Sequence, residues 1–435
     1  MRKKSRPNSL FRVIVCVMAL AFMIPLAAHA QDDKAGEQKT KKAPAMSEKV
    51  YKKLTEAQEL IEAKNYQQGL AILNELAQEK NLSSYEIAQT YNYFAYTYFT
   101  LEKYKEAIGA YEKVLAQPDL PEALVQNSLY TVAQLYFITE NYKKAIETIN
   151  TWLKTVPKPT ENAYMLLGQA YYQLEQYKQS LEPLHKAYDM VKERGDAPKE
   201  NLLLLLRVDY FNLGDYKSML KVLKELVALY PKSEYWLTMA GAYSELKEFK
   251  KQTSILEMLY EGGALQSGPQ QLNLANLYLL GEAPYKAAKV LEAGMKAGKI
   301  DRDVRNLRLL SQAWLQAQES EKSIIPLREA ATRSKDGDVD MRLAQAYLNL
   351  DKYKEAVDAL TSALKKGGLE RPDQANVMLG LAQFELQNFE AAKRAFGIAK
   401  EDSRSRKAAE QWLAYVVSEQ NRKQQIEESL QRRRQ

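Results

Sequence analysis

Apolar side chains recur every three or four positions from about residue 47 to residue 400, and polar side chains fill most of the positions between them. This spacing places the apolar residues on one face of an α-helix, because an α-helix turns once in about 3.6 residues. Polar turn segments, such as "LGD" at 213–215 and "YPKS" at 230–233, interrupt the pattern. The pattern therefore predicts an all-α protein made of many short helices.

A short phrase repeats along these helices: "LEKYKEAI" begins at Leu101, and the nearly identical "LDKYKEAV" begins at Leu350. The aromatic residue of the phrase has equivalents about 36 residues apart, at Tyr66, Tyr104, Tyr142, Tyr177, Tyr216, Phe249, Tyr285, Tyr353 and Phe389. The one long gap is halved if Ser320 marks an eroded copy. A period in the mid-thirties is typical of a solenoid of about ten small repeats and argues against duplication of one large domain.

Each copy carries small and aromatic residues at fixed places. Nine residues before the repeated aromatic there is usually a small residue: Ala57, Ala95, Ala133, Gly168, Ala240, Ala344 and Gly380. Three residues after that small residue there is often a tyrosine: Tyr98, Tyr136, Tyr171, Tyr210, Tyr243 and Tyr347. Another small residue follows the aromatic by three: Gly69, Ala107, Ala145, Ser180, Ala356 and Ala392. Small residues allow two antiparallel helices to approach closely, and we expect the tyrosines to fill the space between neighbouring repeats.

This pattern resembles the tetratricopeptide repeat (TPR). The segment "YWLTMAGAYSELKEF" carries Trp236, Ala240, Tyr243 and Phe249 at the spacing of that family. The resemblance covers about residues 47–400 and implies a right-handed superhelical solenoid of about ten helix-turn-helix units, in a family of binding scaffolds. The fifth copy departs from the pattern, with Arg207 where a small residue is expected.

The segment 401–435 is predicted as a C-terminal capping helix that ends in a basic tail. A solenoid needs such a cap, because its last repeat otherwise exposes an apolar face. We expect Trp412, Leu413 and Tyr415 to be among its buried residues. The tail "QRRRQ" is a solvated end or, less favoured, a contact to anionic lipid.

The first 30 residues predict a secretory signal peptide. A basic head without acids precedes the unbroken apolar run from Val13 to Ile24, and "AHA" ends at Ala30, where we place the cleavage site. An uncleaved anchor is the alternative, but the run is short for a spanning helix. Residues 31–46 are polar and nearly devoid of large apolar side chains, so they predict a flexible leader.

Composition and candidate chemistry argue against an enzyme. Without residues 1–30, the chain has 57 basic and 55 acidic residues, so the basic pI gives no support to nucleic-acid binding. The only cysteine, Cys16, leaves with the signal, and His185 is the only histidine that remains. No phosphate loop, metal-ligand cluster or nucleophile with a base is recognisable. We therefore expect no catalytic residue, no metal, no cofactor and no small-molecule substrate.

A protein or extended peptide is then the expected partner. The resemblance implies that the first helix of each repeat lines a concave face, at positions six and three before the small residue and one and four after it. In copies two to four these positions carry amides, aromatics and one methionine: Gln89, Asn92, Tyr96, Phe99, Asn127, Tyr130, Gln134, Phe137, Asn162, Met165, Gln169 and Tyr172. Amides offer a donor and an acceptor to a peptide backbone, and aromatics provide rigid contact area. The alternative is that these aromatics only fill a core between repeats.

The fifth copy has a different lining set, Asn201, Leu204, Val208 and Phe211, which overlaps the leucine run at 202–206. A helix that is apolar over most of its circumference is usually an interior one, so we favour burial over a second contact site.

Longer segments, "KAPAMSEKVYKKLTEAQELIEAKNYQQGL" and "SGPQQLNLANLYLLGEAPYKAAKVLEAGM", resemble periplasmic TPR proteins that accompany TonB energy-transduction systems of gammaproteobacteria. This resemblance implies a periplasmic accessory of iron or haem uptake, with TonB or its inner-membrane motor proteins as partners. The competing interpretation is an adaptor for cell-envelope assembly, such as outer-membrane protein insertion, peptidoglycan synthesis or pilus biogenesis. The sequence does not specify the oligomeric state.

Overall fold

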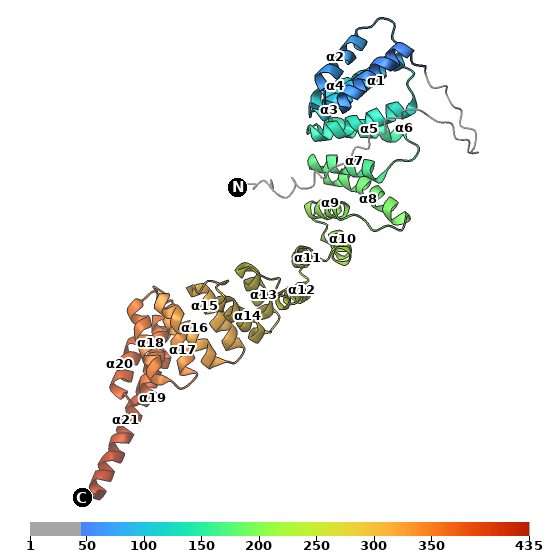
Figure 1. Ribbon diagram of the computed structural model, residues 1–435. Helices are drawn as coiled ribbons and strands as arrows, with labels where there is room; N and C mark the ends of the chain where they lie inside the picture. The colour runs from blue at the N-terminus through green and yellow to red at the C-terminus, as the bar shows by residue number, and fades with distance from the viewer. Residues whose placement is uncertain (1–44, 435) are drawn as a thin grey trace. The chain divides into compact units, whose positions relative to one another are not determined.

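The computed structural model describes residues 45–434, and within this range α-helices joined by short turns and loops are the only regular secondary structure (Figure 1). The predictions for residues 1–30 and for nearly all of the leader lie outside the described residues. The helices are α1 (Glu48–Glu62), α2 (Tyr66–Ala77), α3 (Ser84–Thr100), α4 (Tyr104–Leu115), α5 (Glu122–Ile138), α6 (Tyr142–Thr155), α7 (Glu161–Gln173), α8 (Tyr177–Glu193), α9 (Glu200–Asn212), α10 (Tyr216–Leu229), α11 (Ser233–Glu245), α12 (Phe249–Glu261), α13 (Gly268–Leu280), α14 (Pro284–Lys296), α15 (Val304–Gln316), α16 (Ser320–Arg333), α17 (Asp338–Leu348), α18 (Tyr353–Lys366), α19 (Pro372–Glu385), α20 (Phe389–Ala399) and α21 (Arg406–Arg434).

The helices form ten pairs followed by α21, which confirms the expected all-α solenoid of about ten repeats. The repeated aromatic is the first residue of the second helix in eight of the ten pairs. Tyr285 is the second residue of α14, and Ser320 begins α16, so the eroded copy is a real repeat. Among residues 45–434, no helix is long and apolar enough to cross a membrane.

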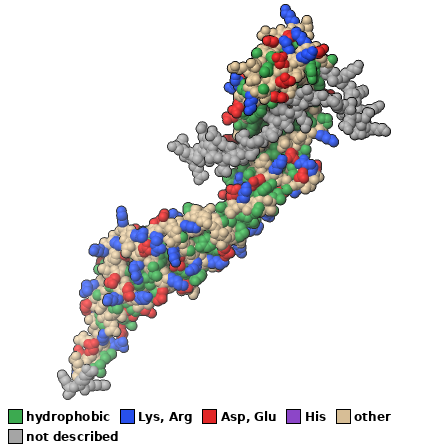
Figure 2. Space-filling view, in the orientation of Figure 1, with side chains coloured by type: hydrophobic (Ala, Val, Ile, Leu, Met, Phe, Trp, Pro, Cys, Tyr) green, Lys and Arg blue, Asp and Glu red, His purple; other side chains and the backbone are tan. Residues whose placement is uncertain are grey.

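The chain divides into two compact parts, which meet between Lys232 and Ser233. We call residues 45–232 the N-terminal part and residues 233–434 the C-terminal part. In each part, every helix packs mainly on the helices before and after it in the chain. Charged side chains of both signs are interspersed on the visible surface of each part (Figure 2).

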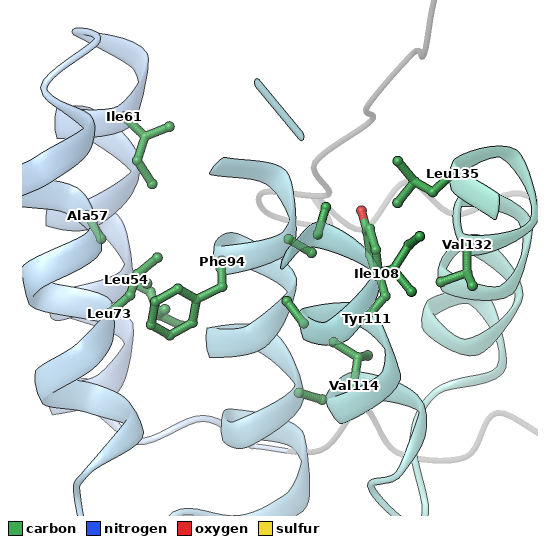
Figure 3. Packing of buried hydrophobic residues seen from close by; sticks show 14 of the residues in the cluster. Leu54, Ala57, Ile61, Leu73, Phe94, Ile108, Tyr111, Val114, Val132 and Leu135 are labelled. Atoms are coloured by element: carbon green, nitrogen blue, oxygen red, sulfur yellow. The ribbon is translucent and has the colours of Figure 1, made fainter. Parts of the chain in front are cut away.

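A continuous apolar core runs through the first repeats of the N-terminal part. Phe94 of α3 lies between the first repeat and the second, beside Leu54 and Leu73 (Figure 3). On the other side of the second repeat, Tyr111 of α4 approaches Leu135 of α5. Each repeat therefore buries its apolar residues against both of its neighbours, as a solenoid requires.

The small residues occupy the points where the two helices of a repeat approach most closely. A Cβ atom added to Gly168 of α7 would lie 2.6 Å from Cδ2 of Leu184 on α8. A Cβ atom on Gly380 of α19 would lie 2.7 Å from the ring of Phe396 on α20. Distances this short are sterically excluded, so the expected reason for small residues at these positions is confirmed.

The tyrosines three residues later join one repeat to the preceding one. Tyr136 Oη donates to Glu112 Oε1 at 2.6 Å, from α5 to α4. Tyr210 Oη and His185 Nε2 are 2.6 Å apart and link α9 to α8. The only histidine outside the first 30 residues therefore has a structural partner in the described fold.

The turn inside each repeat contains a residue in the left-handed region. This residue lies two positions before the second helix in all ten pairs, at Lys64, Glu102, Glu140, Glu175, Gly214, Lys247, Glu282, Gln318, Asp351 and Gln387. Only Gly214 is a glycine, so nine repeats place a side chain in a conformation that disfavours L-residues by about 1–2 kcal/mol. Packing of the two helices must therefore dictate the turn.

The leucine run is buried as expected, since Leu202, Leu203, Leu205 and Leu206 are all in the core.

The expectation that Tyr415 is buried in the C-terminal helix is wrong. Its ring contacts Phe384 at 5.4 Å, but the residue is 48% exposed, and Ala409 and Val416 are the buried residues of α21. The helical period explains the difference, because Tyr415 and the buried Val416 are neighbours in sequence and point in different directions.

A buried carboxylate fixes the last repeat to the turn before α21. Asp373 of α19 accepts from Arg371 Nη2 at 2.6 Å and from Ser405 Oγ at 2.6 Å. Arg404 also pairs with it, at 3.3 Å. These partners, with Arg371 as the main cause, hold the pKa of Asp373 well below its usual range.

Substituting alanine for two glycines should change stability in opposite directions. Gly214 has φ +70° and Gly109 lies inside α4, and an added Cβ meets nothing within 4 Å at either position. Gly214→Ala should destabilise the chain by about 1 kcal/mol through backbone strain, whereas Gly109→Ala should stabilise it by about 0.5–1 kcal/mol. Urea unfolding followed by circular dichroism measures both. Equal effects of the two substitutions would show that backbone conformation at residue 214 is irrelevant.

Asp373→Asn should release α21. Because the pKa of Asp373 is lowered in the folded chain, its stabilising contribution is present above its ordinary value near 4 and disappears as the pH falls below it. We expect the free energy of unfolding to fall by about 2 kcal/mol at pH 7. The loss is smaller than for a fully buried ion pair, because Arg371 and Arg404 both reach solvent. Hydrogen exchange of residues 406–416 should accelerate, while the exposed control Asp358→Asn should leave exchange there unchanged.

Candidate peptide-binding face

The twelve predicted lining residues lie on α3, α5 and α7, the first helices of repeats two to four. Asn127 and Asn162 are exposed, and eight others are half-buried: Gln89, Asn92, Tyr96, Phe99, Tyr130, Phe137, Gln169 and Tyr172. Gln134 and Met165 are buried, each only 7% exposed. Ten of the twelve side chains therefore keep surface that a partner could contact.

Amide side chains form one row of this face. Gln89, Asn127 and Asn162 occupy the same repeat position on α3, α5 and α7, and Asn201 continues the row on α9. α7 is in direct contact with both α5 and α9, so the last three amides lie on neighbouring helices. Each amide can donate to a backbone carbonyl and accept from a backbone N–H. Such a row matches the uniform chemistry of an extended peptide backbone.

Aromatic side chains form a second row, four residues after the small residue. Each one packs on the aromatic that begins the second helix of its own repeat. The ring centroids are 6.0 Å apart for Phe99 and Tyr104, 5.3 Å for Phe137 and Tyr142, and 5.7 Å for Tyr172 and Tyr177. Burial is the main cause of the raised pKa of Tyr172. These rings contribute to the fold and also present a rigid edge to solvent.

The middle of the face is more closed than the sequence suggests. Met165 belongs to an apolar cluster with Leu202 and Leu205 of the next repeat. Tyr130 packs on Trp152, with 5.0 Å between ring centroids. A cavity of about 170 Å³ in the N-terminal part lies between α6, α7 and α8, and none of the twelve residues lines it. The accessible chemistry of the face is therefore concentrated in the amide and aromatic rows.

One charged residue behind this face escaped the sequence analysis. Asp209 of α9 is fully buried (0% exposed), and both of its carboxylate oxygens lack a hydrogen-bond partner. Burial raises its pKa to about 7. The same repeat position carries Leu135, Ala170 and Ala242 in other repeats, so aligning the repeats would have revealed the anomaly. The negative charge of Asp209 also contributes to the raised pKa values of Tyr172 on α7 and Tyr177 on α8.

Among residues 45–434, no group of three or more histidine, cysteine, aspartate or glutamate side chains could hold a metal ion. The isolated carboxyl group of Asp209 has no accessible surface on which a substrate could bind.

Family comparisons match three segments of the chain. Tetratricopeptide repeat models match residues 208–233 and residues 341–417. The chain contains tetratricopeptide repeats. A third model, described as anaphase-promoting complex, cyclosome, subunit 3, matches residues 110–187. That segment runs from α4 into α8 and includes most of the candidate face. No curated protein matches the chain.

Solved structures share the repeat architecture at low sequence identity. A tetratricopeptide repeat protein from Parabacteroides merdae is 13% identical, with a TM-score of 0.34, and the match covers 57% of this chain and 94% of that one. YrrB, described as a TPR protein with an unusual peptide-binding site, is 16% identical over 42% of this chain and 89% of its own, with a TM-score of 0.34. The Cut9–Hcn1 hetero-tetramer of the APC/C matches at 12% identity and a TM-score of 0.28, over 85% of this chain and 84% of that one.

Asp209→Asn should stabilise the chain in a pH-dependent way. The folded-state pKa of about 7 lies above the ordinary value of about 3.9, so the folded state disfavours the charged form. The burial penalty is therefore absent below about pH 4, grows as the pH rises, and is complete above pH 7. The asparagine variant should match the original chain near pH 4 and exceed its stability by up to about 4 kcal/mol at pH 8.

Urea unfolding between pH 4 and pH 8 measures this difference. Asp215→Asn is the matched control, because exposed Asp215 caps α10 by accepting from Ser218 N–H at 3.0 Å and has a lowered pKa. Its difference from the original chain should not grow above pH 5. A pH-independent effect of Asp209→Asn would mean that Asp209 is ionised in the folded chain at every pH tested.

Proposed function

We propose that the chain is a non-catalytic scaffold that holds an extended segment of another protein on the amide and aromatic rows of α3, α5, α7 and α9. The observation that carries this proposal is the amide row, Gln89, Asn127, Asn162 and Asn201, repeated at one position of four successive repeats. Packing alone does not require amides there, because at least two of them, Asn127 and Asn162, are exposed. A backbone-directed row would bind by general peptide shape, and the adjacent aromatics would select for side chains.

The location and the pathway are part of the same proposal. The basic head, apolar run and "AHA" exit of residues 1–30 support export, and the phrases shared with TonB-associated proteins support the periplasm. We infer an accessory role in TonB-dependent uptake of iron chelates or haem, with TonB or its motor proteins as the bound partner. An adaptor for envelope assembly is the second candidate, because such adaptors use the same repeats in the same compartment.

Photocrosslinking in intact cells tests the face and the partner together. A photoreactive residue replaces Tyr96 or Phe137 on the face, and Tyr415 of α21 in a comparison variant. We expect adducts from Tyr96 and Phe137 that contain TonB or motor components, identified by mass spectrometry. Adducts with assembly machinery would favour the second candidate. Adducts only from Tyr415 would show that the amide and aromatic rows are not the binding face.

A growth comparison distinguishes the two pathways independently of the crosslinks. Cells that lack the protein should grow poorly when iron is scarce if it serves uptake, and should be sensitive to detergent if it serves envelope assembly. The double variant Asn127→Ala, Asn162→Ala should reproduce the deletion phenotype without a loss of thermal stability, because both side chains are exposed.

A further inference from the structure

The second helices carry a feature that the proposed function does not use. Within residues 45–434, a proline lies inside a helix only in α8 and α16, at Pro183 and Pro326. Both are the seventh residue of the second helix in their repeat. Proline has no N–H, so it leaves the carbonyl of the residue four positions earlier without its helical partner. These carbonyls belong to Gln179 and Lys322.

A hollow lies beside each of these helices, and each hollow is lined by the residue with the released carbonyl. The hollow beside α8 is about 170 Å³ and includes Gln179. The groove beside α16 is about 410 Å³ and includes Lys322. The larger groove lies between α16, the end of α17 and the start of α18, within the C-terminal part. Its lining residues are Glu321, Lys322, Ile324, Ile325, Arg328, Tyr347, Lys352 and Glu355.

The charges distinguish the two hollows. Beside α8, the cation Lys186 is paired with Glu182 at 3.0 Å. Beside α16, Arg328 donates to Tyr347 Oη at 3.3 Å and has no carboxylate partner among the described residues. An arginine fork can donate five hydrogen bonds and matches a carboxylate with two of them. Arg328 is therefore a cation with most of its hydrogen-bonding capacity open to the groove.

The other lining cations do not compete for this role. Lys352 pairs with Glu321 at 3.7 Å, and Lys322 pairs with Glu319 at 3.0 Å while it lies 4.9 Å from the ring of Trp314. Glu355 lies on the rim without an ion pair among the described residues. A ligand carboxylate near Arg328 would therefore be attracted by Arg328 and repelled weakly by Glu355.

An exposed apolar residue completes the groove. Ile325 is 67% exposed, more than any other large apolar side chain in the described residues. It stands next to the buried Ile324 and Pro326, so an aliphatic side chain placed there would be covered on one side by the helix. Ile325 therefore offers an apolar contact surface beside the cation Arg328.

We propose that the groove between α16 and α18 is a second docking site, for a peptide segment that carries a carboxylate next to aliphatic side chains. The carboxylate binds Arg328, a backbone N–H of the segment donates to the carbonyl of Lys322, and an aliphatic side chain packs on Ile325. This site is formed mainly by second helices and is separate from the amide and aromatic rows of the proposed function. The scaffold then holds two different segments, one through uncharged groups and one through an ion pair.

Methyl NMR on the purified full chain, labelled at isoleucine δ1 methyl groups, tests the proposal. The probe is the peptide acetyl-Ile-Glu-Ile-amide, and the comparison peptide is acetyl-Ile-Gln-Ile-amide. We expect a saturable shift of the Ile325 methyl signal, assigned with Ile325→Val, and binding of the acidic peptide at least fivefold tighter than that of the amide peptide. This preference should decrease when the salt concentration rises.

Three variants give directional controls. Arg328→Gln should remove the preference for the acidic peptide, and Arg394→Gln, at an exposed position on α20, should leave it unchanged. Glu355→Gln should strengthen binding of the acidic peptide about twofold, because it removes a like charge. The proposal is overturned if the Ile325 signal does not move, if both peptides bind equally, or if Arg328→Gln keeps the preference. None of these results depends on the amide row, so they leave the proposed function untouched.

Discussion

The close approach of the two helices in each repeat is the contact on which the rest of the structure depends. At Gly168 and Gly380, even one added carbon atom would overlap Leu184 or Phe396. The approach forces the intervening turn into the left-handed region in all ten repeats, although only Gly214 accepts it without strain. Helix packing thus dictates the turn, and the turn residues themselves remain variable and polar.

A second consequence of this packing is that a partner can contact only the side chains that the core does not bury. The tyrosine after each small residue is used between repeats, as in the contacts of Tyr136 with Glu112 and of Tyr210 with His185. Residues of the first helices that the core does not cover remain accessible, and the amides Gln89, Asn127, Asn162 and Asn201 are among them. The aromatic row belongs to both groups, because each ring packs on its own repeat and still reaches solvent.

The repeat period and the small-residue positions predicted the helices closely, including the eroded copy that begins at Ser320. The period reports which face of a helix is buried, and it does not report how deeply. Gln134 and Met165 were predicted as lining residues and are buried. Met165 is covered by Leu202 and Leu205 of the next repeat. Asp209 and the groove at Arg328 were missed for a similar reason. The role of a single charged residue depends on its neighbours from other helices, and the sequence does not show which residues these are.

The two faces differ in how a partner would be recognised. Amides of repeats two to five present the same hydrogen-bonding pattern several times, so a peptide could bind there in more than one register. The groove at Arg328 presents one cation without a carboxylate partner among the described residues, one released carbonyl and one exposed apolar side chain, an arrangement that favours a single register. Binding at the first face would depend on the length of the peptide, and binding at the second would fix the position of the bound segment. That division of roles follows from the repeats themselves, because Arg328 stands where α8, which also has an internal proline, carries His185, and this difference distinguishes the groove from the hollow beside α8.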